Sequence, residues 1–358
     1  MKISLVSTVF NDQQGVIAFF EAIEIQTSKP DEVVVVDAGS TDGTWEVLKD
    51  QQNKTSNRDF KVIALQEVRC NVARGRDLAI EAAAGDVIVS TDIGCEWRPK
   101  WLEELVTPFY KDPDLELVIG SWVVRKEKLR GKWALTEWAL KGDRKLEADA
   151  DSYSSSRSIA YKKDVWEALG RYPEDLTLAA DDAVFHFLIE KAEVNRVGSP
   201  KINCYWHRHE TLRGFLREQF RYGLGDGESQ IRLRDLVLIG GRLAFETVGL
   251  ISGSALLFTS GFTFWALLTA AAVSIVLRIA KLFSARSRLQ NENVKWPLLH
   301  LVAFTYSTKI YWIWGYAKGL LRGWHACRDC RSRLKKMTPE LFRSRLREQR
   351  SPDSVAVN

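Results

Sequence analysis

The chain has 358 residues, of which 46% are hydrophobic, and a formal net charge of +5. This length permits a full hydrophobic core and predicts one large domain or two smaller ones. Five irregularly spaced cysteines argue against a disulfide framework. The basic residues gather behind apolar segments near the C-terminus, which argues against a nucleic-acid-binding protein.

The N-terminal part of the chain alternates between strand-like and helix-like patterns. It opens on a strand-like run, Lys2 to Phe10, without the charged and apolar regions of a cleaved signal peptide. Buried strands are predicted at 3–7, 32–37, 61–65 and 86–90, and helices between them at 14–26, 41–48 and 73–84. Strand–helix–strand repetition at this spacing predicts βαβ units and a parallel sheet.

The middle of the chain is more mixed. Helices are predicted at 101–110, 181–191 and 211–222, and a strand at 117–124. The polar run 152–156 is typical of a loop.

The composition turns apolar after residue 236. Residues 248–277 carry no charged side chain. This uncharged run is longer than the roughly 20 residues that a transmembrane helix needs. Basic residues flank this region on both sides, so the pattern favours a two-helix hairpin, Leu236 to Phe258 and Gly261 to Phe283, with both ends cytoplasmic. One long tilted helix or three spans are the alternatives.

Two charged residues interrupt the first of these spans, and an aromatic-rich segment follows the second. Arg242 and Glu246 are four residues apart and are expected to pair on one helix face. Residues 297–324 are expected to lie along the cytoplasmic interface. The aromatic side chains of this segment that we expect at headgroup depth are Tyr311, Trp312, Trp314 and Tyr316. The basic tail that follows suits an anionic membrane surface.

Acidic residues follow two of the predicted strands. One strand ends in Asp37-Ala38-Gly39-Ser40-Thr41-Asp42-Gly43-Thr44, and a second is followed by Thr91-Asp92-Ile93-Gly94. Ligands of doubly wound sheets bind at the carboxyl ends of the parallel strands, so these acids are expected at a binding site. A plain acidic strand–helix turn is the alternative.

These motifs resemble the signature of family 2 glycosyltransferases. The run Val35 to Thr44 carries the resemblance, together with Ser7 to Asp12 and Ala73 to Asp86, and it covers roughly residues 1 to 225. A Rossmann dehydrogenase would need GxGxxG after the first strand, and Val9 to Gly15 lacks it. The resemblance implies an α/β GT-A fold and transfer of a sugar from a nucleotide-sugar donor.

The resemblance also implies donor-binding residues. Thr8 and Asp37 would hold the base and ribose, since a carboxylate accepts from their donors, and Asp42 belongs to the same set. Arg76 would face the diphosphate, with a surface ion pair as the alternative.

Asp92 occupies the first position of the family's DxD motif, where an acid coordinates Mg²⁺ or Mn²⁺. Gly94 stands at the second acidic position, so metal binding would rest on Asp92 with the substrate phosphates, or with Glu96 as a further ligand. The metal would neutralise charge on the departing nucleoside diphosphate.

Asp182 matches the family's catalytic base, and Asp181 would orient the acceptor or the base. Two acids that merely favour a helix N-terminus are the alternative. His207 or His209 is expected near the diphosphate or metal. Arg221 lies in a degenerate form of the QxxRW motif and is expected to line the acceptor cleft.

We therefore expect three parts: a GT-A catalytic domain at 1–230, membrane-associating helices at 231–324 and a basic cytoplasmic tail at 325–358. The expected reaction is inverting sugar transfer to a saccharide acceptor linked to a lipid, at the cytoplasmic face of the inner membrane. The alternatives are a transferase acting on polyprenyl phosphate and a catalytically silent membrane scaffold that binds nucleotide sugar.

Overall fold

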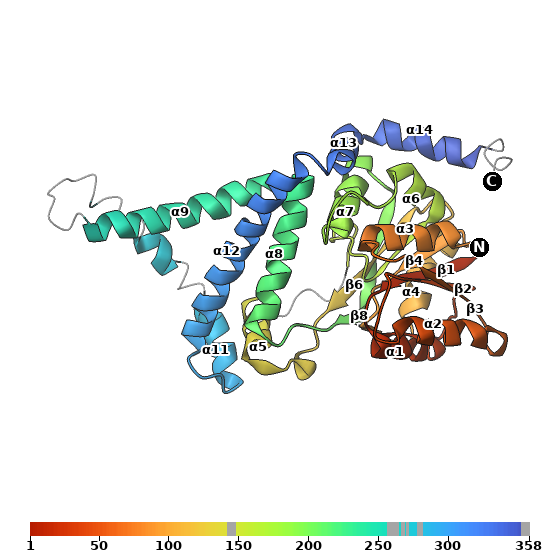
Figure 1. Ribbon diagram of the computed structural model, residues 1–358, viewed down its shortest axis with the longest axis horizontal. Coiled ribbons are helices and arrows are strands. Elements are labelled where there is room, and N and C mark those ends of the chain that lie inside the picture. The colour runs from red at the N-terminus through yellow and green to blue at the C-terminus, as the bar shows by residue number, and fades with distance from the viewer. Residues whose placement is uncertain (142–147, 256–264, 266–268, 270–271, 278–281, 352–358) are drawn as a thin grey trace. The chain divides into compact units, whose positions relative to one another are not determined.

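The computed structural model describes residues 1–141, 148–255, 265, 269, 272–277 and 282–351 (Figure 1). The chain divides into two compact units. The first comprises residues 1–125, 145–207 and 324–358, and the second comprises residues 126–144 and 208–323.

An eight-stranded sheet forms the centre of the first unit, in the order β3-β2-β1-β4-β7-β6-β8-β5. The strands are β1 (Ile3–Val9), β2 (Glu32–Asp37), β3 (Lys61–Gln66), β4 (Val87–Ser90), β5 (Cys95–Trp97), β6 (Leu117–Val123), β7 (Ile159–Lys162) and β8 (Arg196–Trp206). Strands β3, β2, β1 and β4 are parallel, whereas β7 runs antiparallel to both β4 and β6. The prediction of a parallel sheet is therefore confirmed for the N-terminal half, and the complete sheet is mixed.

The burial of the parallel strands explains their composition. Val33, Val34, Val35 and Val36 are all fully buried, as a strand covered on both faces requires. Figure 1 shows α1 (Gln13–Glu24) and α2 (Thr44–Asn53) on one face of the sheet and α3 (Val72–Ala82) on the other. The remaining helices of this unit are η1 (Lys54–Asn57), α4 (Trp101–Lys111), α6 (Lys163–Leu169), α7 (Asp181–Ala192), α13 (Arg328–Lys336) and α14 (Pro339–Arg350).

The C-terminal helices α13 and α14 pack against α7 and α6. Phe342 and Leu346 of α14 are buried. Arg333 donates to the backbone carbonyls of Arg171 and Tyr172 at 3.2 and 3.3 Å. Residues that follow the second unit in sequence thus complete the first.

The second unit is helical. It contains η2 (Lys126–Lys128), α5 (Gly131–Lys141), α8 (Leu212–Ser229), α9 (Leu233–Ala255), α11 (Phe283–Asn291) and α12 (Pro297–Gly323). The expected pair forms on α9, where Arg242 Nε lies 3.0 Å from Glu246 Oε1. Glu246 also accepts from the Tyr306 hydroxyl of α12 at 3.1 Å.

Glycines bring α8 and α12 into close contact. A Cβ added at Gly315 or Gly319 of α12 would lie 2.2 or 2.1 Å from a backbone oxygen of α8, and the same holds from the α8 side at Gly223 and Gly227. Small residues of this kind let two helix backbones approach closely.

The face of α12 turned to α8 carries two of the aromatic residues expected at headgroup depth. Trp312 and Tyr316 are buried, and they donate to Asp226 Oδ2 at 2.9 Å and to the Ile231 carbonyl at 2.8 Å. Their side chains therefore pack within the protein, and their depth in a membrane stays a prediction. Trp314, by contrast, is 56% exposed.

The described residues cover only part of the two expected membrane spans. Within these residues, no helix combines the length and the apolar character needed to cross a membrane. The first expected span, 236–258, falls mostly on α9, whose hydrophobic run is interrupted by Arg242 and Glu246. Most of the second, 261–283, lies outside the described residues.

Candidate functional site

Three elements of the first unit bring charged side chains together. Asp92 follows β4, Arg76 lies on α3, and Asp181 and Asp182 form the first turn of α7. Arg76 Nη2 lies 2.5 Å from Asp92 Oδ1, and Nη1 of the same guanidinium pairs with Asp181 Oδ2. Residues far apart in sequence therefore meet through one arginine.

Arg76 is held as a cation. Only 5% of its side chain is exposed, and burial alone would lower its pKa. The carboxylates of Asp181 and Asp92 outweigh burial and raise the pKa of Arg76 above its ordinary value. The ring of Tyr172 lies 5.6 Å from the guanidinium carbon, and burial raises the pKa of this tyrosine to about 12.

The acid pair begins α7 from a strained backbone position. Ala180, the residue before Asp181, has φ +74°, in the left-handed region that a non-glycine residue rarely adopts. Such strain gathers at functional sites. Asp182 is half-buried, and its carboxylate lies 3.5 Å from the Ser155 hydroxyl.

Asp37 shapes the turn after β2. Its Oδ2 accepts from the backbone N–H groups of Gly39 at 3.2 Å and Ser40 at 3.0 Å, and from Gln66 Nε2 at 2.8 Å. Asp37 is fully buried. The structure therefore assigns this acid a structural role, and its contact with base or ribose stays a prediction.

Asp42 and Thr8 lie at the ends of neighbouring elements. Asp42 is exposed at the start of α2, and the hydroxyl of Thr44, 2.5 Å away, lowers the pKa of its carboxyl. Thr8 is half-buried near the end of β1. A Cβ at Gly75 of α3 would lie 2.8 Å from Thr8 Cγ2, so α3 approaches the end of β1 closely.

The second position of the acidic motif offers space but no ligand. Gly94 has φ +95°, and beyond its chain neighbours no atom of the part of the chain that the structure describes lies within 4 Å of where a Cβ would stand. Glu96 Oε1 lies 2.9 Å from His207 Nε2, and its Oε2 lies 3.4 Å from Arg125 Nη1. Among the described residues, no group of three His, Cys, Asp or Glu side chains is placed to hold a metal ion. A cation here would therefore have Asp92 as its protein ligand and would need phosphate oxygens to complete its coordination.

His209 and Arg221 belong to the second unit. His209 Nε2 lies 3.7 Å from Glu218 Oε1. This glutamate forms a buried group with Arg208 and Glu137. Arg221 is exposed on α8. The structure assigns neither residue to the constellation around Arg76.

Ser155 and Arg157 are the residues that sequence reasoning missed. They lie in and just after the polar run read only as a loop, and they contact Asp182 and Asp92. Polarity was the available signal, and it does not distinguish a loop that lines a site from any other loop.

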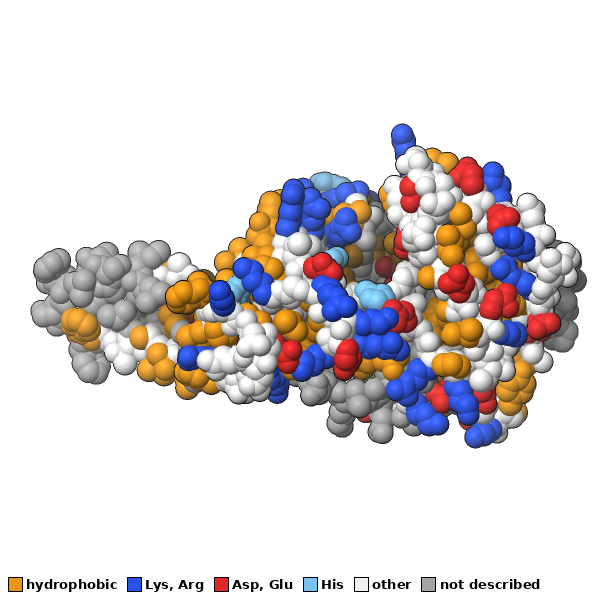
Figure 2. Space-filling view, turned by 90° about the horizontal axis from the view of Figure 1, so that it is seen from below, with side chains coloured by type: hydrophobic (Ala, Val, Ile, Leu, Met, Phe, Trp, Pro, Cys, Tyr) orange, Lys and Arg blue, Asp and Glu red, His pale blue; other side chains and the backbone are white. Residues whose placement is uncertain are grey.

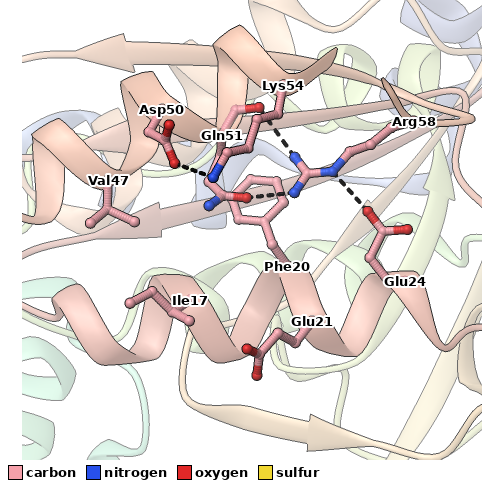
Figure 3. A pocket seen from close by; sticks show the side chains of 9 residues that line it. All are labelled: Ile17, Phe20, Glu21, Glu24, Val47, Asp50, Gln51, Lys54 and Arg58. Atoms are coloured by element: carbon pink, nitrogen blue, oxygen red, sulfur yellow. Dashed lines mark hydrogen bonds and ion pairs between the residues drawn. The ribbon is translucent and has the colours of Figure 1, made fainter. Parts of the chain in front are cut away.

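A cavity of about 390 Å³ lies apart from these residues, between α1 and α2 (Figure 3). Arg58 lines it, with its guanidinium carbon 5.0 Å from the Phe20 ring centroid and its Nε 2.7 Å from Glu24 Oε1. None of the expected site residues lines this cavity.

The mixed sheet and the acids that follow its parallel strands define a GT-A-like glycosyltransferase fold. A solved structure shares it over 90% of this chain and 87% of its own, with a TM-score of 0.53 and 20% identity. That structure is the mannosyltransferase PcManGT of Pyrobaculum calidifontis in complex with GDP-Man and Mn²⁺.

Residues 4–164 match the family model of glycosyl transferase family 2. This part of the chain is therefore similar to that family.

Three curated relatives each match about half to two thirds of this chain. A glucosyl-dolichyl phosphate glucuronosyltransferase of Haloferax volcanii is 27% identical over 48% of this chain and 56% of its own length. The glycosyltransferase AglE of the same organism is 23% identical over 66% and 75%. The O-antigen chain rhamnosyltransferase WbaN of Salmonella anatum is 26% identical over 46% and 52%. The chain thus spans little more than half the length of the first and third of these relatives.

Proposed function

We propose that this protein transfers a sugar from a nucleotide-sugar donor to an acceptor hydroxyl. The observation that carries the proposal is the bridge formed by Arg76 between Asp92 and Asp181, beside Asp182. One buried cation here links the acid expected at the donor diphosphate to the acid pair expected at the acceptor.

The donor would lie across the ends of β1, β2 and β4. Thr8, Asp37 and Asp42 would surround the base and ribose, and Arg76 and His207 would lie toward the diphosphate. Asp92 would hold Mg²⁺ or Mn²⁺ together with the phosphates, as the Mn²⁺ bound in the Pyrobaculum structure supports. When bound, such a cation neutralises negative charge on the leaving group.

Asp182 would act as the general base. Its carboxylate would take the proton of the acceptor hydroxyl while that oxygen attacks the anomeric carbon. A single base permits one in-line displacement, so the anomeric configuration would invert. Asp181, fixed by Arg76, would orient the acceptor or Asp182.

A lipid-linked saccharide is the acceptor that we propose. The Haloferax volcanii relative is named for a glucosyl-dolichyl phosphate, a sugar already carried on a lipid, which favours this acceptor over a bare polyprenyl phosphate. The O-antigen chain transferase supports assembly of a surface glycan.

Exposed apolar side chains of the second unit support attachment to a membrane, which we propose is the cell membrane at its cytoplasmic face. Leu299, Ile310 and Leu321 recur every eleven residues along α12 and are 67%, 53% and 79% exposed. Eleven residues make close to three helical turns, so the three side chains lie on one face. Figure 2 shows hydrophobic side chains at the surface of this unit. A stripe of this kind suits the interface of a bilayer.

The replacement Asp182→Asn tests the reaction. Purified protein is screened with nucleotide sugars and Mn²⁺, and release of nucleoside diphosphate is measured with lipid-linked saccharide, or polyprenyl phosphate, as acceptor. The amide keeps the shape of the carboxylate but cannot take the proton, so turnover should fall about 10²- to 10⁴-fold while donor affinity changes little.

Asp164→Asn is the matched control, since Asp164 is also an acid in the first turn of a helix, α6. It should leave turnover unchanged. If Asp182→Asn keeps most of the wild-type turnover, another residue is the base. If the wild type binds donor but turns over no acceptor, the silent scaffold is the better description.

A further inference from the structure

Two guanidinium groups face the carboxylate of Asp92. Arg76 Nη2 lies 2.5 Å from Oδ1, and Arg157 Nε lies 3.8 Å from Oδ2. Arg157 stands in the loop before β7, distant in sequence from both Arg76 and the acid motifs.

Aromatic rings hold Arg157 in place. Its guanidinium carbon lies 4.0 Å from the centroid of the Trp206 ring and 5.3 Å from that of Trp122. Arg157 Nη1 donates to the Ser155 hydroxyl at 3.0 Å, and 15% of the side chain is exposed. A guanidinium fixed in this way presents its donors without a large loss of side-chain entropy on binding a ligand.

The position of Arg157 matches both ends of the expected reaction. The Ser155 hydroxyl that it contacts lies 3.5 Å from the carboxylate of Asp182. Arg157 therefore lies between the acid expected at the donor diphosphate and the acid expected to be the base.

The charges around Asp92 indicate what Arg157 does at this position. The positive charge of Arg76 is already matched by Asp92 and Asp181. A donor diphosphate adds further negative charge. Because Gly94 stands at the second acidic position of the motif, Asp92 would be the one acid of this motif that holds a metal ion. A second fixed cation is therefore needed, and planar guanidinium groups bind phosphate oxygens through two parallel hydrogen bonds.

We propose that Arg157 binds the diphosphate of the donor and stabilises the leaving nucleoside diphosphate. As the bond from the anomeric carbon to the phosphate oxygen breaks, its electron pair passes to that oxygen, and Arg157 neutralises the charge that develops there. This inference rests on the proposed function. Arg157 would neutralise part of the charge on the leaving diphosphate that a bound metal ion also neutralises.

The experiment measures nucleotide binding by calorimetry in EDTA, so that the contribution of the arginine is separated from that of a metal. The probes are GDP, UDP, CDP and dTDP, each with its monophosphate, on wild type, Arg157→Gln and Arg157→Lys. Arg157→Gln should weaken binding of the preferred diphosphate about ten- to hundredfold, the range expected for hydrogen bonds to a charged group. The monophosphate should be affected little, and Arg157→Lys should lie between.

Arg58→Gln is the matched control. Its side chain is 12% exposed and lies against the Phe20 and Phe60 rings, but it borders the cavity between α1 and α2 (Figure 3). It should lose a comparable amount of stability in thermal unfolding and no diphosphate affinity.

Three results would overturn the inference. Equal diphosphate affinity in wild type and Arg157→Gln would do so while leaving the proposed function intact. Equal loss of diphosphate and monophosphate affinity would show that Arg157 only supports the fold. If wild type binds no nucleotide even with Mn²⁺, the proposed function itself fails, and the inference fails with it.

Discussion

Asp77 is a buried acid next to Arg76 on α3. Its Oδ1 accepts from the indole of Trp166 at 2.9 Å and from the backbone N–H of Tyr172 at 3.0 Å. Its Oδ2 has no hydrogen-bond partner among the residues that the structure describes. Burial raises the pKa of Asp77 to about 7. Asp77 thus fixes the backbone of the tyrosine that lies beside Arg76, while burial favours the protonated form of its carboxyl.

We predict that Asp77→Asn removes a pH dependence of stability. The folded protein binds the proton more tightly than the unfolded chain, so this contribution to stability is complete below about pH 4 and is lost as the pH rises through about 7. The full loss is of the order of a few kcal/mol. The melting temperature of the wild type should therefore fall relative to that of Asp77→Asn between pH 5 and pH 8. A constant difference across this range would show that Asp77 is charged throughout.

The sequence motifs predicted which residues lie together in the candidate site, but not the ion pairs that join them. The sequence predicted Asp92, Arg76, Asp181 and Asp182 as site residues, and the structure brings them together. The ion pairs between them could not be predicted, because they depend on side-chain directions across three elements. Arg157 could not be found for the same reason. The catalytic and binding roles of all these residues stay predictions.

At the scale of elements, regular patterns were predictable and irregular ones were not. The first four parallel strands, β6 and the helices α1, α3, α4 and α7 form close to their predicted ranges. Strand β8 was missed because Gly198, Pro200 and Lys201 interrupt its hydrophobic pattern, and its pairing with β6 carries register shifts. Strand β7 was also missed, because it is short and is followed directly by α6 without a turn signal in the sequence.

The contact between α8 and α12 leads to a prediction about one glycine. Gly315→Ala would place a Cβ 2.2 Å from the Phe220 carbonyl oxygen, a backbone atom that cannot yield without moving a helix. We expect a loss of about 1–3 kcal/mol in stability, measured by chemical denaturation.

Gly240→Ala on α9 is the matched control, because an added Cβ there meets no atom of the described residues within 4 Å. It should be neutral or stabilising, by up to about 1 kcal/mol, since alanine favours a helix more than glycine does. If Gly315→Ala were equally harmless, the close packing of α8 on α12 would be wrong.

At the scale of the whole molecule, we predict that the second unit binds membranes through α12. The double replacement Leu299→Glu with Leu321→Glu puts two charges on the exposed apolar stripe, where burial in lipid becomes unfavourable. Binding to vesicles of phosphatidylglycerol and phosphatidylethanolamine, measured by flotation, should weaken about tenfold or more.

The control for this experiment is Ile25→Glu with Val68→Glu. These residues of the first unit are 61% and 66% exposed, so they match the replaced leucines in exposure. They should leave flotation unchanged. Equal flotation of wild type and the α12 variant would remove α12 as the attachment surface.

The first unit is discontinuous in sequence, and its last segment leads to the final prediction. Arg343 of α14 pairs with the buried Glu116, Arg350 Nε lies 2.6 Å from Asp164 Oδ2, and Phe342 is fully buried. The basic end of the chain is therefore packed on the first unit. Truncation after Gly323 should lower the melting temperature of this unit by roughly 10 °C or more, because two large apolar side chains lose their burial along with these ion pairs. It should also weaken diphosphate binding, since Arg333 no longer holds the backbone around Tyr172, beside Arg76.

Truncation after Ser351 is the matched control and should change neither quantity. A shortened chain ending at Gly323 that melts and binds like the wild type would show that α13 and α14 contribute nothing to the first unit.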